Sequence, residues 1–274
     1  MPPRISLATD DRSPTYDWCF KTVPQVNANN RVVAQPRGKL LGGSSSINFM
    51  MLSHASAVDV DNWEKLGNRG WNFKTMKPYY KKFETYNAPN EVLEKTLGGN
   101  IFDSSLHGSS GPVQITWPHG TSEVDGMWRP TLQALGLGAE EDPRRGSALG
   151  GYPVLKYIDK AAKRTTAATA FYIPNAGRSN LSVLTNAHVN RILFEEHSGI
   201  IDASAVSFSF SDKEYVVSAS REIILCAGSF QSPQILELSG IGSKEILTKH
   251  GMKLVVDNPN VGENLQVGTL SVLE

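Results

Sequence analysis

The stretch 38–48, Gly-Lys-Leu-Leu-Gly-Gly-Ser-Ser-Ser-Ile-Asn, combines residue types that can contact an anionic ligand. Gly42 and Gly43 allow the backbone to approach a ligand where a Cβ would collide, and the serines add hydroxyls and amides. Because the apolar run 47–52 follows, we expect the serines to cap a buried helix whose first N–H groups point back into the loop. The pattern predicts an anion site, although a Gly-Ser surface turn has the same composition.

A second stretch, 222–242, has the pattern of a strand, a glycine turn and a helix. Residues 223–226 are apolar and prone to β structure, and Ala227-Gly228-Ser229 forms a turn of small side chains. Ser232 offers a helix N-cap with Pro233 at the first helical position, and Gly240 occupies the place of a left-handed C-terminal cap. In α/β proteins, turns at the carboxyl ends of strands lie beside ligands.

Together the two stretches resemble the paired signature motifs of the glucose-methanol-choline (GMC) oxidoreductases, flavoenzymes that oxidise alcohols with FAD. The first signature corresponds to residues 38–48 and the second to 228–242. The resemblance covers about residues 14–266. Further similar segments lie between the signatures in the family's order: 61–71, 78–83, 107–112 (His-Gly-Ser-Ser-Gly-Pro) and 180–189.

The resemblance implies a mixed α/β fold in which a Rossmann-like FAD-binding domain is interrupted by a substrate-binding insertion. Residues 1–75 and 182–274 are assigned to FAD binding, and residues 76–181 to the insertion. FAD is expected to be non-covalent, because 35–37 (Gln-Pro-Arg) stands where histidine-linked members carry that histidine. The implied cofactor contacts are Gly42, Gly43, Ser44, Asn48, Phe49 and Met50 along the flavin and its phosphates, Val189 at the adenine, and Ala227 and Gly228 at the dinucleotide.

Two parts of the family pattern are absent from this sequence. No G-x-G-x-x-G turn precedes Gly38, and the residues after 263–266 (Glu-Asn-Leu-Gln) are not the usual Asp-His. The family's catalytic histidine belongs to a C-terminal region that has no counterpart here, so no catalytic residue is assigned. As a fragment of this type, the chain alone is expected to be an apoprotein without alcohol oxidation.

The six histidines do not suggest a replacement base. None has a carboxylate at a sequence spacing that indicates an orienting partner, so each is interpreted as structural or solvated. They are His54, His107, His119, His188, His197 and His250.

The reaction implied for an intact relative is oxidation of the CH–OH group of an alcohol. A base removes the hydroxyl proton while hydride passes from the carbon to the flavin N5. A chain that no longer catalyses is one alternative. A serine amidase is the remote one, since Gly-Gly-Ser-Ser opens that signature and Lys39 is nearby, but the glycines that should follow the serines are missing and no G-x-S-x-G elbow occurs.

Bulk composition fits this class without defining it. The 274 residues suffice for one large or two small domains, and 27 basic residues balance 27 acidic ones without a basic run, which disfavours nucleic acid as a partner. No apolar stretch predicts a membrane span, and residues 1–12 lack a signal-peptide core, so a cytoplasmic protein is expected. Cys19 and Cys226 predict no disulfide framework. The expected partner is a small-molecule alcohol.

Residue periodicity predicts the remaining elements. Tyr79, Tyr80 and Phe83 share one helix face and are expected to face the core. The predicted helices are 62–66, 75–85, 127–137, 161–170 and 243–249, and the predicted strands are 111–117, 181–185, 189–195, 201–210, 215–226 and 252–256. Ser198-Gly199 and Asp212-Lys213 are predicted to be turns between strands.

Overall fold

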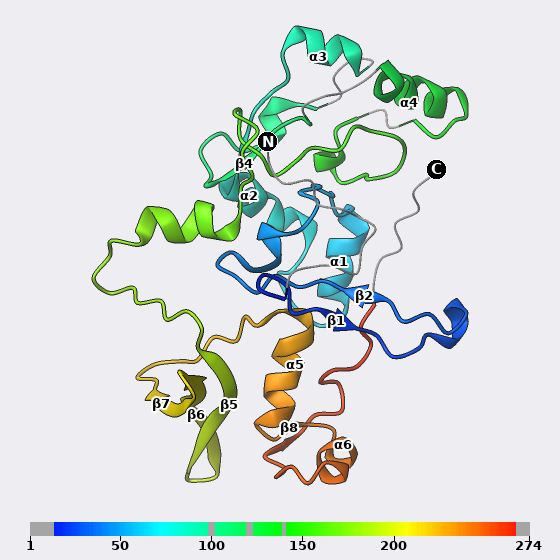
Figure 1. Cartoon of the computed structure of the whole chain (residues 1–274). Helices are drawn as coiled ribbons and strands as arrows, with labels where there is room; N and C mark the ends of the chain where they lie inside the picture. The colour runs from blue at the N-terminus through cyan, green and yellow to red at the C-terminus, as the bar shows by residue number, and fades with distance from the viewer. Residues whose placement is uncertain (1–13, 98–101, 119–122, 139–140, 267–274) are drawn as a thin grey trace. The chain divides into compact units, whose positions relative to one another are not determined.

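The computed structural model describes residues 14–97, 102–118, 123–138 and 141–266. The chain divides into two compact units, one ending at Leu181 and one beginning at Ser182. Helices and short strands occur in both units, which confirms the mixed α/β class (Figure 1).

The first unit contains short helices separated by long loops, with two-stranded sheets among its described residues. β1 pairs antiparallel with β2, and β3 pairs parallel with β4. Its elements are β1 (Phe20–Lys21), η1 (Val26–Ala28), β2 (Ala34–Gln35), η2 (Gly43–Ser46), α1 (Ala57–Lys65), α2 (Phe73–Phe83), β3 (Glu84–Tyr86), α3 (Glu91–Thr96), η3 (Ser104–Leu106), β4 (Val113–Ile115), α4 (Glu123–Ala134), η4 (Pro143–Arg145), η5 (Ala168–Tyr172) and η6 (Ile173–Asn175).

The core of the first unit forms around β4. Val113 and Ile115 are buried, and Trp117 continues the same alternation beyond the strand. These apolar side chains leave water together, which is the main favourable contribution to folding. The buried cluster consists of Leu52, Leu97, Phe102, Val113, Ile115, Trp117, Leu155 and Ala170.

Two glycines of segment 107–112 allow this segment to press against the junction of α2 and β3. A Cβ on Gly108 would lie 1.9 Å from the Lys81 carbonyl oxygen, and one on Gly111 would lie 2.3 Å from the Glu84 nitrogen. No side chain fits at such distances, so the tertiary contact itself requires glycine at both positions.

Side-chain caps place α1 and α2 earlier than predicted. Ser56 and Asp59 form a reciprocal capping box at the start of α1, and the Asn72 side chain accepts a hydrogen bond from the Thr75 amide at the start of α2. Both helices were predicted, but each begins at its cap, because the cap satisfies amides that have no partner within the helix.

Three other predictions for the first unit need correction. Residues 47–52 form no helix; instead the short η2 covers Gly43–Ser46, because Gly42 and Gly43 have positive φ and turn the chain there. The helical segment predicted at 161–170 lies later, at η5 and η6. Tyr79 and Phe83 are 61% and 38% exposed and do not lie in the core.

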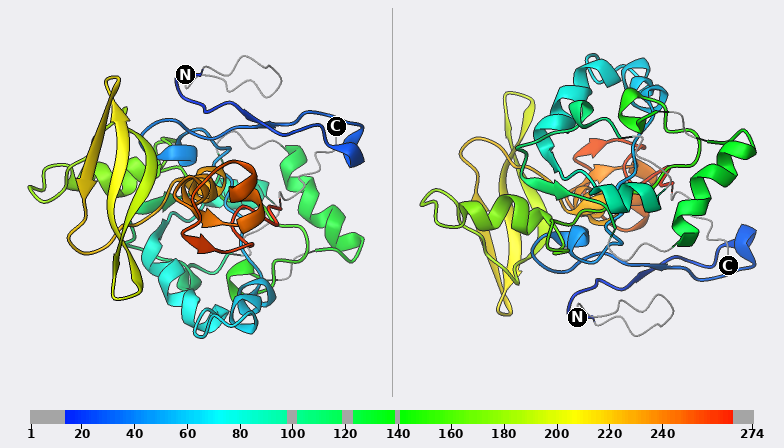
Figure 2. Two further views of the ribbon diagram at one scale, coloured as in Figure 1. Left: turned by 90° about the horizontal axis from the view of Figure 1, so that it is seen from below. Right: turned by 90° about the horizontal axis from the view of Figure 1, so that it is seen from above.

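The second unit contains an antiparallel meander, β5–β6–β7, with helix α5 packed beside β5 (Figure 2). The hairpin turn predicted at Ser198-Gly199 is present, and the turn predicted at 212–213 lies one residue earlier, at Ser211 and Asp212. All four of these turn residues have positive φ. β8 pairs parallel with β9. The elements are β5 (His188–His197), β6 (Ile200–Phe210), β7 (Lys213–Ser218), α5 (Gly228–Leu238), β8 (Ile241–Gly242), α6 (Lys244–Lys249) and β9 (Val256–Asp257).

The second unit also departs from the predicted pattern. Residues 181–185 and 222–226 form no strand, and β7 ends at Ser218. Extended residues become a strand only when a neighbour pairs with them, which the residue pattern alone does not reveal. Helix α5 begins at Gly228 and not after Ser232, since the positive φ of Gly228 (88°) turns the chain four residues earlier.

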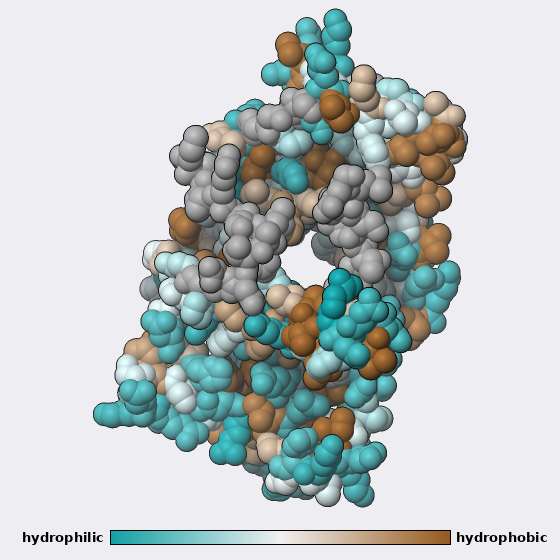
Figure 3. Space-filling model, turned by 45° about the vertical axis from the view of Figure 1, so that its right-hand side comes forward, coloured by the Kyte–Doolittle hydropathy of each residue, from teal (hydrophilic) through white to brown (hydrophobic). Residues whose placement is uncertain are grey.

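Apolar side chains are exposed at many separate places. On the face shown in Figure 3, brown apolar residues alternate with hydrophilic ones. Within the described ranges, no helix has the length and apolar character that would cross a membrane.

Candidate functional site

The signature loop, residues 38–50, folds back on itself. The Gly38 amide donates to Ser44 Oγ at 3.1 Å, and a Cβ on Gly38 would lie 2.3 Å from the Gly43 carbonyl oxygen. Gly42 and Gly43 have φ of 89° and 54°. This reversal therefore depends on glycine at 38, for the close approach, and on two left-handed residues at 42 and 43.

Serine hydroxyls hold the loop in this shape. Ser45 Oγ donates to the Gly42 carbonyl and accepts from the Ala167 amide at 2.9 Å. Ser46 Oγ donates to the Leu41 carbonyl at 3.0 Å. These hydroxyls satisfy backbone groups, which is the role of Ser in a turn and not that of an activated nucleophile.

Arg164 fastens the second half of the signature loop. Its Nη1 donates to the Asn48 carbonyl at 2.7 Å, to Asn48 Oδ1 at 2.9 Å and to the Ser45 carbonyl at 3.2 Å. Asn48 Oδ1 also accepts from the Met50 amide at 3.0 Å, where φ is 60°. Asn48 Oδ1 is thus already hydrogen-bonded within the protein. Arg164 was not predicted as a contact of this loop, because it lies 116 residues beyond Asn48 in the sequence.

One side of the signature loop is open. No heavy atom lies within 4 Å of the position that a Cβ would take on Gly43. Ser44, Asn48 and Phe49 are exposed, while Gly42 and Met50 are half-buried. The predicted contact residues of the first signature therefore present accessible backbone to a ligand.

The predicted contacts of the second signature lie in the second unit. Gly228 has φ of 88° with no atom within 4 Å of its Cβ position, and Ala227 is the N-cap of α5, with no side-chain capping bond. Val189 is half-buried in β5, opposite Phe208 and next to a break in the register. An open glycine at a helix N-terminus suits a phosphate or a dinucleotide, so these residues fit such a group.

A separate ionic cluster is buried in the first unit, formed by Glu84, His107, Asp142 and Arg144. His107 Nδ1 lies 2.9 Å from Glu84 Oε1, and His107 Nε2 lies 3.0 Å from Asp142 Oδ2. The Arg144 Nη2 donates to Glu84 Oε2. Glu84, His107 and Asp142 are 0%, 4% and 1% exposed, so the four charges compensate one another away from water.

These contacts settle the protonation of His107. Burial acts to lower the pKa of His107, but the hydrogen bonds to Asp142 and Glu84 outweigh it and raise the pKa. Burial likewise acts to raise the pKa of Asp142, and its hydrogen bonds with His107 and the Arg144 amide reverse this and lower it. With both ring nitrogens facing carboxylates, His107 is an imidazolium, and the cluster carries two positive and two negative charges.

His54 lies beside this cluster in the opposite protonation state. Its ring centroid is 6.1 Å from that of His107, with the rings at 79°. Burial, followed by the positive charges of Arg144 and His107, lowers the pKa of His54 to about 4. His54 is therefore neutral near pH 7.

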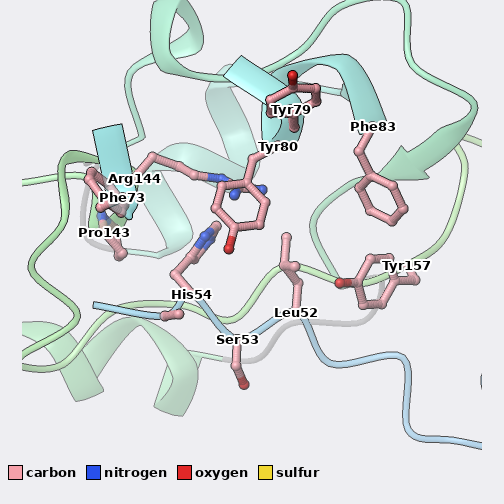
Figure 4. A pocket seen from close by; sticks show the side chains of 11 residues that line it. Leu52, Ser53, His54, Phe73, Tyr79, Tyr80, Phe83, Pro143, Arg144 and Tyr157 are labelled. Carbon is pink, nitrogen blue, oxygen red and sulfur yellow. The ribbon is translucent and has the colours of Figure 1, made fainter. Parts of the chain in front are cut away.

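His54 also lines a cavity of about 420 Å³ beside α2 (Figure 4). Tyr79, Tyr80 and Phe83, which were predicted to face the core, form part of its wall. The lining residues are Leu52, Ser53, His54, Ala55, Phe73, Tyr79, Tyr80, Phe83, Pro143, Arg144 and Tyr157.

A mixed α/β fold that presents open glycine turns to a ligand has the features of a dinucleotide-binding protein. The sequence model described as GMC oxidoreductase matches residues 19–269, and the chain belongs to this family.

Known relatives agree with this assignment. The chain is 39% identical over 280 residues to Dehydrogenase mpl7 of Monascus purpureus, covering 99% of this chain and 44% of that protein. It is 33% identical to the oxygen-dependent choline dehydrogenase of Pectobacterium carotovorum, covering 95% and 44%. A solved structure of an FAD-dependent oxidoreductase from Chaetomium thermophilum matches with a TM-score of 0.83 at 33% identity, covering 89% and 42%. The chain thus spans less than half the length of these relatives.

Proposed function

We propose that these residues belong to an FAD-dependent oxidoreductase that acts on the CH–OH group of a small alcohol. The observation that carries this proposal is the open, Arg164-fastened signature loop in a chain of the GMC oxidoreductase family. The relative named as a choline dehydrogenase supports an alcohol as the substrate. In this proposal residues 1–75 and 182–274 contribute to FAD binding, and residues 76–181 to the substrate side.

Backbone contacts are the main contribution of this chain to the cofactor site. Gly43 and Gly228 leave room for a ligand against the main chain, whereas Ser46 Oγ would lie 2.5 Å from a Cβ on Gly42. The exposed Ser44 hydroxyl and Asn48 amide nitrogen offer polar atoms. When bound, FAD supplies the acceptor for the two electrons removed from the alcohol. The protein's task is to hold the cofactor in a fixed position, which Arg164 serves by fixing the Ser45 and Asn48 carbonyls.

A substitution at Gly43 tests the proposed contact. Asn tolerates a left-handed φ, and no atom lies within 4 Å of its Cβ position, so Gly43→Asn should leave the fold intact while filling the space proposed for the flavin. We expect FAD affinity, measured by quenching of flavin fluorescence, to fall by about tenfold or more, as for a misplaced ligand contact worth about 1.4 kcal/mol.

Gly199→Asn is the matched control. Gly199 also has positive φ (82°) and open space at its Cβ position, but it lies in the β5–β6 turn. Equal FAD affinity of the two variants would remove the signature loop from the cofactor site. If the 274-residue chain binds no FAD, the comparison is made in a chain extended to the length of its relatives.

Non-covalent attachment of FAD is a separate proposal. Acid precipitation of the flavin-loaded protein should leave the yellow colour in the supernatant, because Gln35-Pro36-Arg37 offers no histidine for a covalent bond. Colour retained in the pellet would contradict it.

The serine amidase alternative gains no support from the geometry. Ser45 and Ser46 donate to backbone carbonyls, and the Lys39 ammonium lies over the Trp18 ring at 5.0 Å. A non-catalytic chain stays the second candidate. Purified chain with excess FAD, an alcohol panel and a dye acceptor distinguishes the two, because turnover would rule out the non-catalytic candidate.

A further inference from the structure

The cavity beside α2 has the properties of a second ligand site. Its volume of about 420 Å³ falls within the range of small-molecule pockets. All its lining residues lie between Leu52 and Tyr157, in the first unit, and none is a predicted flavin contact. Binding of an occupant to this cavity is therefore independent of the proposed FAD contacts, although part of its wall belongs to residues 76–181.

Two nitrogen atoms at the cavity have no partner. Among the described residues, His54 Nε2 and Arg144 Nε are shielded from solvent and form no hydrogen bond. His54 is only 9% exposed, and its ring rises from the floor of the cavity toward Tyr80 and Arg144 (Figure 4). Buried polar atoms are almost always paired, and an Arg Nε–H can only donate. An oxygen acceptor is the group that this end of the cavity lacks.

The cavity carries no net charge to attract an ion. The Arg144 guanidinium is already paired with Glu84, whose own charge is used by the ionic cluster. His54 is neutral near pH 7, because burial lowers its pKa to about 4. An ionised ligand would lose its hydration without gaining a counter-ion, so the cavity favours an uncharged molecule.

Aromatic side chains make up most of the wall. Phe73, Tyr80, Phe83 and Tyr157 surround the space, and Tyr79 stands at its exposed side, 61% accessible to solvent. Aromatic rings favour other rings in offset-stacked or edge-to-face contact. Exposed aromatic residues that cluster around one cavity are more typical of a binding surface than of residues needed for folding.

We propose that this cavity binds a small uncharged aromatic molecule that carries a carbonyl or hydroxyl oxygen. The ring packs against Tyr80 and Phe83 with its edge toward Tyr79, and the oxygen faces His54 and Arg144.

Acetophenone is a suitable probe, because it is neutral, aromatic and not an alcohol. Saturation-transfer NMR titrations of the 274-residue chain should show acetophenone binding about three- to tenfold tighter than ethylbenzene, because acetophenone gains one hydrogen bond. Benzoate, which adds a charge to a similar shape, should bind more weakly than acetophenone. No acetophenone binding, equal affinity for ethylbenzene, or benzoate binding as tightly as acetophenone would overturn the proposal.

Two exposed tyrosines locate the site. Tyr79→Ala should weaken acetophenone binding by about fivefold, since an aromatic contact is lost. Tyr215→Ala, at a 42% exposed tyrosine of β7, should not change it. Equal effects of the two variants would place binding outside this cavity.

His54→Phe tests the polar end of the cavity. The preference for acetophenone over ethylbenzene should shrink in this variant, provided that its tryptophan fluorescence shows a native fold; an unchanged preference would remove His54 from the site. If His54→Phe does not fold, the Tyr79 comparison still decides the proposal.

Discussion

Two regions of the first unit are held by charged side chains in opposite ways. The ionic cluster pairs each charge with an opposite one, and Glu84, His107 and Asp142 are almost fully buried. The signature loop is fastened by Arg164, which donates to the Ser45 and Asn48 carbonyls and to the Asn48 side chain, all uncharged. The cluster thus joins segments of the core, whereas Arg164 shapes one surface loop.

The difference indicates that the ionic cluster contributes mainly to the stability of the unit, whereas Arg164 contributes mainly to the shape of the signature loop. Removing one member of a buried ionic group leaves its partners uncompensated, which is costly for the whole unit. Removing a guanidinium that binds carbonyls frees a loop whose groups water can solvate.

Glu84→Gln should have the largest effect. His107 and Arg144 would both lose the carboxylate that compensates them in the core, and we expect a loss of about 3–5 kcal/mol in the free energy of unfolding. All five tryptophans lie in the first unit, so urea titration followed by tryptophan fluorescence reports on it. The control is Glu141→Gln in the same unit, at a 54% exposed side chain that pairs with Arg145. A change below about 1 kcal/mol for Glu84→Gln would show that the cluster adds little.

Acid should destabilise the first unit through His54. The pKa of His54 in the folded chain, about 4, lies below the ordinary histidine value of 6.5. The contribution of neutral His54 to stability is therefore complete above pH 6.5 and is lost as the pH falls toward 4. Each pKa unit corresponds to about 1.4 kcal/mol, which gives a loss of about 2–3 kcal/mol between pH 7 and 4.5. Urea titrations across this range should show a smaller pH dependence in His54→Phe. In His197→Phe, at a 70% exposed position, the dependence should match the unsubstituted chain.

His107 should make the stability of the first unit fall as the pH becomes alkaline. Because its folded pKa is raised, its stabilisation is complete below pH 6.5 and is lost as the pH rises through the folded pKa. If stability stayed constant from pH 6.5 to pH 10, His107 would not be the imidazolium described above.

Arg164→Lys should have the smallest effect on stability, about 1 kcal/mol, since a single ammonium can replace only part of the hydrogen bonding of Arg164 Nη1. Hydrogen exchange of the amides in 42–50 should accelerate while that of β3 and β4 stays unchanged. Arg178→Lys is the control, because Arg178 is exposed and bonds to Asn180. Faster exchange in β3 and β4 would show that Arg164 supports the core as well as the loop.

Local residue patterns predicted much of the second unit. The turn at Ser198-Gly199, the strands of the meander and the helix after Ser243 follow from residue alternation, turn chemistry and capping, and the second turn was predicted within one residue. The strand predicted at 222–226 failed because pairing needs a neighbouring strand, which is a property of the fold and not of the segment.

The family signatures were also visible in the sequence, because glycine is required wherever the backbone must turn left-handed or approach another group closely. Gly42, Gly43 and Gly228 all have positive φ, as such motifs require. The sequence also identified the family. It did not reveal Arg164, whose contact with Asn48 spans 116 residues.

Tertiary structure alone decided the chemistry of the histidines and the aromatic face. His107 was predicted to be structural or solvated, and it lies in a buried cluster. Its carboxylate partners lie 23 and 35 residues away in the sequence and showed no local spacing. Tyr79, Tyr80 and Phe83 do share a helix face, yet they line a cavity because segment 52–55 and Arg144 lie opposite them. Sequence fixes backbone preferences through local sterics and capping, whereas pKa values and cavities depend on which distant side chains folding brings within a few ångströms.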